Sequence, residues 1–126
     1  MAESLVHDAH RHIGLLPAYP FYGGPPVHPD SSARGTVAEL IADMGAERTE
    51  RALVIPNYGV PDPAVSFSFN ELVLEAAAKD DRINCGLWCS PRPQDADLNA
   101  AALALAGEKG VKVLKTSFLL GGRADD

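Results

Sequence analysis

Short runs of branched aliphatic residues recur along the chain and predict β-strands. The runs begin near residues 4, 51, 83 and 111, and glycine, proline or charged residues flank them. The predicted strands cover residues 4–8, 51–56, 83–89 and 111–115. Strands that are apolar along most of their length are typical of a parallel sheet covered by helices.

Three amphipathic segments separate these strands and predict helices. Thr36 precedes the first segment with Glu39 three residues later, a pairing that forms a capping box. Ser68 and Glu71 repeat the pairing before the second helix, and the third is expected over about residues 97–108. Strand and helix therefore alternate, which indicates an α/β fold.

The spacing of the strands indicates a barrel. A (β/α)₈ barrel of about 250 residues uses about 31 residues per unit. The last two intervals between strand starts, roughly 32 and 28 residues, match that value, whereas the first is longer, at roughly 47. We therefore predict that residues 1–126 form one partial domain, the N-terminal half of a (β/α)₈ TIM barrel with four parallel strands and three helices. Another polypeptide would complete it.

The excess length of the first interval lies in a segment rich in proline and glycine, residues 13–35. A long loop after the first strand would lie at the functional face of a barrel. The segment contains Tyr19, Phe21, Tyr22 and His28, and aromatic side chains are costly to leave in a solvated loop. His28 is thus a candidate substrate contact, the alternative being a surface insertion without a role.

Two histidines at the end of the first strand predict a metal site. Side chains alternate along a strand, so His10 and His12 point the same way, about 6.6 Å apart along it. Two such imidazoles can bind one metal with bonds of about 2.0–2.1 Å. Asp8 is expected on the same face, as a weak ligand or an acceptor that orients a ring. Zinc is the first candidate and manganese another; the alternative is two ordinary polar residues where a strand meets a loop.

On these residues the chain resembles the amidohydrolase superfamily of metal-dependent hydrolases, most closely the branch with aminocarboxymuconate-semialdehyde-decarboxylase-like enzymes. That branch begins D-x-H-x-H-x-G near its N-terminus, as Asp8, His10, His12 and Gly14 do here. The resemblance implies a metal-activated water that hydrolyses an amide, lactone or related carbonyl substrate. It equally allows metal-dependent non-oxidative decarboxylation.

The resemblance also implies ligands that this chain does not carry. Members have histidines after the fifth and sixth strands and an aspartate, the general base, after the eighth. A complementary polypeptide carrying strands five to eight, either a separate subunit or a cleaved C-terminal fragment, is therefore the expected partner in an oligomer. In some branches a carboxylated lysine after the fourth strand bridges two metals, and Lys115 holds that position. An unmodified Lys115 would be a simple cation.

Residues that follow the second and third strands are candidate substrate contacts, because the carboxyl ends of barrel strands meet at one face. Arg92 is suited to holding a carboxylate with two hydrogen bonds. Local turn or packing roles are the alternative for all of them. The candidates are Asn57, Tyr58, Trp88 and Arg92.

Composition narrows the choice of partners. The chain is 46% hydrophobic with a net charge of −6, which suits one globular domain and disfavours nucleic acid or anionic membranes as partners. It has no apolar run of about 20 residues and no secretory signal at its start, so a cytoplasmic location is expected. Cys85 and Cys89 would lie about 13 Å apart in a strand, too far for a disulfide.

Two further interpretations belong to different classes of protein. The first is a catalytically silent half-barrel that scaffolds or regulates a partner, which predicts no bound metal. The second is a doubly wound domain with a small-ligand crevice, although no glycine-rich phosphate loop follows the first strand.

Overall fold

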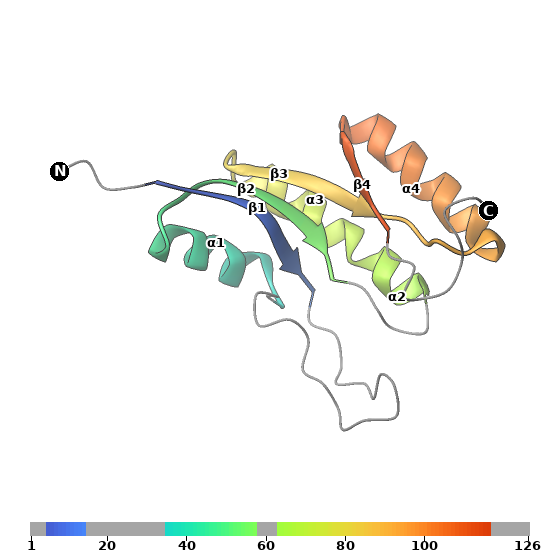
Figure 1. Ribbon diagram of the computed structural model, residues 1–126, viewed down its shortest axis with the longest axis horizontal. Helices are drawn as coiled ribbons and strands as arrows, with labels where there is room; N and C mark the ends of the chain where they lie inside the picture. The colour runs from blue at the N-terminus through green and yellow to red at the C-terminus, as the bar shows by residue number, and fades with distance from the viewer. Residues whose placement is uncertain (1–4, 15–34, 58–62, 117–126) are drawn as a thin grey trace, which may run out of the picture.

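The computed structural model describes residues 5–14, 35–57 and 63–116. Its centre is one parallel sheet with the strand order β1-β2-β3-β4 (Figure 1). The strands are β1 (Val6–Ile13), β2 (Thr49–Pro56), β3 (Ile83–Trp88) and β4 (Val113–Lys115). The predicted α/β class and the four parallel strands are thus confirmed.

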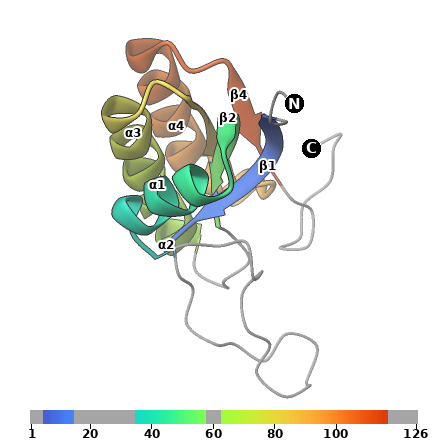
Figure 2. The ribbon, with the colours of Figure 1, turned by 90° about the vertical axis from the view of Figure 1, so that its left-hand side faces the viewer.

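The helices all lie on one side of this sheet (Figure 2). They are α1 (Val37–Ala46), α2 (Pro63–Ser68), α3 (Asn70–Lys79) and α4 (Ala96–Lys109), with the 3₁₀ turn η2 (Pro93–Asp95) before α4. A doubly wound sheet has helices on both faces and a reversal in strand order. Neither is seen in the described ranges, and the architecture is consistent with half of a barrel. No described helix has the length and hydropathy needed to cross a membrane.

The hydrophobic core fills the space between the sheet and its helices. Leu40 and Met44 of α1 and Val73 of α3 are fully buried there against Val54 of β2. We call this side of the sheet the helix face and the opposite side the free face. Figure 2 shows no described helix over the free face, which is where a barrel would place its interior.

Two helix starts were predicted from capping boxes, and one is correct. Thr36 caps α1: its side chain accepts the Glu39 N–H, and the Glu39 carboxylate accepts the Thr36 N–H. The box at Ser68 is wrong, because Ser68 is the last residue of α2 and its hydroxyl donates to the Val65 carbonyl. The short helix α2 was not expected, and its presence shifts the start of the next helix to Asn70.

The first strand extends beyond its predicted end at residue 8. Pairing with β2 continues to Ile13, opposite Pro56, and the Asn57 N–H donates to the Ile13 carbonyl at 2.7 Å. The two histidines therefore lie within a strand rather than in the following loop. Backbone pairing restricts their ring positions, which matters for metal binding.

An ion pair fixes the turn between α3 and β3 and predicts a pH effect. Arg82 donates to both carboxylate oxygens of Asp80 and to the Thr49 carbonyl. Hydrogen bonds from Arg82 hold the pKa of Asp80 below its usual range. The folded-state pKa is depressed, so this contribution is present above the ordinary carboxyl pKa and is lost as pH falls through the depressed value.

Asp80→Asn is therefore expected to lower the free energy of unfolding at pH 7 by about 0.2–1 kcal/mol, because Arg82 is partly exposed to solvent. The difference in unfolding free energy between Asp80→Asn and the wild type should shrink in acid, below about pH 4. Urea unfolding at both pH values measures it, with Asp81→Asn at the neighbouring exposed carboxyl as the control. A deficit that is equal at both pH values would contradict the assignment.

Candidate metal centre

The rings of His10 and His12 face one another on β1. Their Nε2 atoms are 2.9 Å apart, the ring centroids are 4.7 Å apart, and the rings are tilted by 50°. Two nitrogens bound at about 2.0–2.1 Å to a tetrahedral zinc lie about 3.3–3.4 Å from each other. A small opening of the pair would therefore admit the ion, and the donor types suit zinc.

The surroundings of His12 determine which of its nitrogens carries the proton. His12 is buried, and its Nδ1 lies 3.4 Å from the Pro56 carbonyl oxygen, which can only accept. We therefore assign the proton to Nδ1, which leaves the lone pair of Nε2 directed at His10. In the metal-free pair His10 donates from its Nε2. A backbone carbonyl that orients a ring through its other nitrogen is common behind metal ligands.

An irregularity in β1 places the two rings on the free face of the sheet. Asp8 pairs with Ala52 and Arg11 pairs with Val54, so β1 advances three residues where β2 advances two. This extra residue is a β-bulge, a feature that redirects side chains. Past the bulge His12 lies opposite Ile55, on the free face of the sheet.

The same bulge moves Asp8 to the other face. Its partner Ala52 belongs to the core against the helices, so the expectation that Asp8 shares the face of the histidines is wrong. The Asp8 carboxylate accepts the His10 backbone N–H at 3.0 Å and the Arg11 Nε–H at 2.8 Å. Burial alone would raise the pKa of Asp8, but these hydrogen bonds and the positive charge of Arg11 lower it, so the group is ionised.

Of the remaining candidates, Asn57 lies near the histidine pair and Lys115 lies far from it. Asn57 is buried at the end of β2, one residue beyond the Pro56 carbonyl that faces His12. Lys115 is in β4, three strand spacings or about 14 Å along the sheet from β1. The sheet therefore places Asn57 near the histidine pair and leaves Lys115 distant from it.

Trp88 and Arg92 follow β3 but are engaged locally. Trp88 is 0% exposed, and its backbone N–H and carbonyl are both bound by the side chain of Asn70. Arg92 donates its Nε–H to Asp95 at 2.8 Å. The structure thus supports a packing role for Trp88 and a loop-fixing role for Arg92. The three-residue spacing of Arg92 and Asp95 is the sequence feature that could have indicated this local ion pair.

Tyr58 and His28 lie outside the described residues, as does most of the segment 13–35. Within the described residues, no three His, Cys, Asp or Glu side chains gather in a way that would hold a metal. The described part of the chain therefore supplies two convergent donors, one fewer than the three protein ligands of a typical catalytic zinc site.

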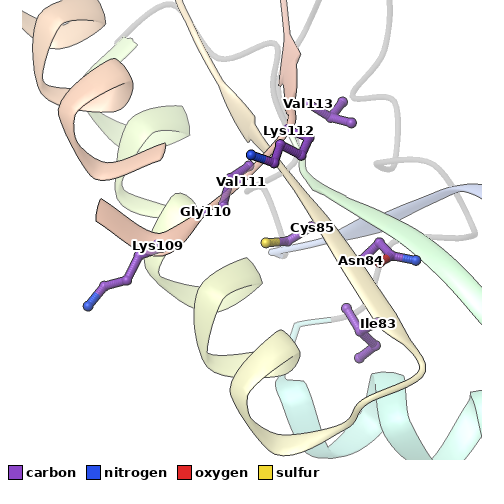
Figure 3. A pocket seen from close by; sticks show the side chains of 8 residues that line it. All are labelled: Ile83, Asn84, Cys85, Lys109, Gly110, Val111, Lys112 and Val113. Carbon is purple, nitrogen blue, oxygen red and sulfur yellow. The ribbon is translucent and has the colours of Figure 1, made fainter. Parts of the chain in front are cut away.

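A separate pocket of about 340 Å³ lies at the end of the sheet where the strands begin (Figure 3). It forms because β4 starts only opposite Gly86, so the first residues of β3 have open space beside them. Burial raises the pKa of the Cys85 thiol in this pocket, and that of Cys89 elsewhere. Raised pKa values disfavour a reactive thiolate at either cysteine.

Comparison with known proteins adds no assignment: no family model, curated protein or solved structure matches this chain.

Proposed function

We propose that this chain supplies half of a metal centre to a barrel hydrolase of the amidohydrolase type. The observation that carries the proposal is the 2.9 Å approach of the His10 and His12 Nε2 atoms on one strand of a parallel sheet. Barrel enzymes place their catalytic groups at the carboxyl ends of such strands. His12 lies opposite Ile55, at the carboxyl end of β2.

The two histidines have different tasks in this proposal. His12 is the fixed ligand, because it is buried and the Pro56 carbonyl orients its ring. His10 is more exposed, and its Nε2 must give up its proton before it can bind a cation. A divalent metal held there would supply a water of lowered pKa and a Lewis acid for the substrate carbonyl. An amide, lactone or related carbonyl compound is the proposed substrate.

The edges of the sheet support a partner that carries strands five to eight. Within the described residues, β1 and β4 each have a neighbouring strand on one side only. Leu5 and Val6 at the β1 edge and Leu114 at the β4 edge are exposed apolar side chains. Open edges and exposed apolar groups favour association. The same partner would supply the missing ligands and the general base.

The proposal predicts a metal-dependent hydrolase activity in the purified assembly. Native mass spectrometry first identifies any second polypeptide that accompanies the chain. A panel of small amides and lactones is then assayed before and after chelation, and again after zinc or manganese is added back. We expect activity to fall at least about tenfold on chelation and to return with the metal.

Two results would overturn this function. Hydrolysis that persists unchanged in the apo assembly would remove the metal from the mechanism. Carbon dioxide release from a carboxylic acid substrate, without hydrolysis of any amide or lactone, would assign the assembly to the decarboxylases instead.

A further inference from the structure

A set of polar contacts on the helix face connects the end of α1 to the strand that carries the histidines. Arg11 is at its centre, with a side chain that is only 11% exposed. The guanidinium donates from Nε to Asp8 and from Nη2 to Glu47, the C-cap residue of α1. We call Asp8, Arg11 and Glu47 the clamp.

The clamp spans the β-bulge. The register changes between Asp8 and Arg11, and these are the two residues that the clamp joins. Asp8 Oδ1 also accepts the N–H of His10, which lies inside the bulge. One carboxylate therefore binds the bulge at two points, and Glu47 holds the guanidinium from the helix side.

The bulge decides where the His10 ring points. If the extra residue lay after His10 instead, His10 would lie opposite Val54 while His12 stayed opposite Ile55. Val54 is fully buried in the core against the helices, so His10 would face the helices and not His12. Because the extra residue lies between Asp8 and Arg11, His10 and His12 both take the free face.

We propose that Asp8, Arg11 and Glu47 are positioning residues that hold the bulge and thereby set the ring of His10 against that of His12. The role in metal binding rests on the proposed function, whereas the role in ring placement does not. Asp8 acts through the backbone of His10 rather than through either ring. Arg11 acts from the opposite face of the sheet, and neither residue touches the metal or the substrate.

The charges of the clamp favour this role. Arg11 is a mostly buried cation placed between two carboxylates, and each carboxylate accepts from a different nitrogen. Charge-assisted hydrogen bonds with fixed directions restrict the side chains that make them. Removing Arg11 would leave Asp8 to hold the bulge without its counter-charge, and removing Asp8 would leave the His10 N–H without this acceptor.

The first test measures ring placement in the metal-free protein. In Asp8→Ala, hydrogen exchange at the His10 amide should become at least about tenfold faster, because a bond to a charged acceptor is lost. Nuclear Overhauser contacts between the two rings should weaken in Asp8→Ala and in Arg11→Met. Asp8→Asn keeps an oxygen that can accept the His10 N–H, and it should restore most of the amide protection.

The second test uses cobalt as a spectroscopic substitute for zinc in the full assembly. We expect the clamp variants Asp8→Ala and Arg11→Met to bind Co²⁺ about ten- to a hundredfold more weakly, with shifted visible bands, because an orienting contact is lost. Two controls should keep the bands of the wild type. Glu50→Gln removes the charge of an exposed partner of His7 on the same strand pair, and Ile83→Val weakens the core without touching the clamp.

The outcomes separate this inference from the proposed function. Unchanged amide exchange and unchanged ring contacts in both clamp variants would overturn the positioning role, whatever the metal does. A wild-type assembly that binds no cobalt, but whose variants lose the ring contacts, would sustain the positioning role and remove the metal function. Band shifts of equal size in Ile83→Val would reduce the clamp to a general contributor to stability.

Discussion

Replacing His12 with alanine is expected to lower the zinc affinity of the assembled protein by more than about a hundredfold. Loss of an orienting contact alone costs about ten- to a hundredfold, and loss of a ligand should cost more. His12 is also the better fixed of the two donors, since it is buried and its ring is oriented by the Pro56 carbonyl. His10→Ala should also lower the zinc affinity. The double variant His10→Ala, His12→Ala should contain no zinc after dialysis.

A third histidine on the same strand provides the matched control. His7 is exposed, and its Nε2 contacts Glu50 at 2.7 Å rather than the His10–His12 pair. His7→Ala should therefore retain the zinc content of the wild type, as measured by elemental analysis and competition with a chromophoric chelator. Equal zinc content in the wild type and in the double variant His10→Ala, His12→Ala would exclude the proposed site and favour the scaffold interpretation.

Gly14→Ala is expected to destabilise the fold by about 2–5 kcal/mol. Gly14 has a φ of +96°, and a left-handed backbone costs an L-residue about 1–2 kcal/mol. A Cβ atom at this position would lie 2.7 Å from Cγ of the Phe69 ring, and overpacking costs about 1–3 kcal/mol. Urea unfolding measures the change.

A helical glycine gives the opposite expectation. Gly107 in α4 has open space where a Cβ would lie, so Gly107→Ala should stabilise the protein by about 0.5–1 kcal/mol. If Gly14→Ala were as stable as the wild type, the approach of Phe69 to β1 would be wrong. The glycine of the D-x-H-x-H-x-G pattern would then need another explanation.

Gly14 shows what a local sequence pattern can and cannot predict. Its position after the histidines was visible in the sequence, but the need for a residue without Cβ comes from Phe69, 55 positions later, which packs across it. The signal for a helix start at Ser68 failed for a similar reason. The capping pattern depends on four residues only. The start of α3 depends instead on the short helix α2, which precedes Asn70.

The histidine pair was predictable because a strand alternates its side chains regardless of the rest of the fold. His10 and His12 were expected on one face, and they lie 2.9 Å apart at their Nε2 atoms. The place of Asp8 was not predictable, because alternation fails at a bulge and no residue in β1 marks the extra position. The bulge follows from pairing with β2 and from Arg11, which Glu47 holds from α1.

The sequence by itself determined the alternation of strands and helices, the parallel sheet and the two neighbouring imidazoles, since these depend on periodicity over a few residues. Only the tertiary structure decided which face Asp8 takes, which nitrogen of His12 faces His10 and why residue 14 is glycine. Each of these depends on atoms from β2, α1 or α3 that are distant along the chain, and contacts of that kind leave no local pattern.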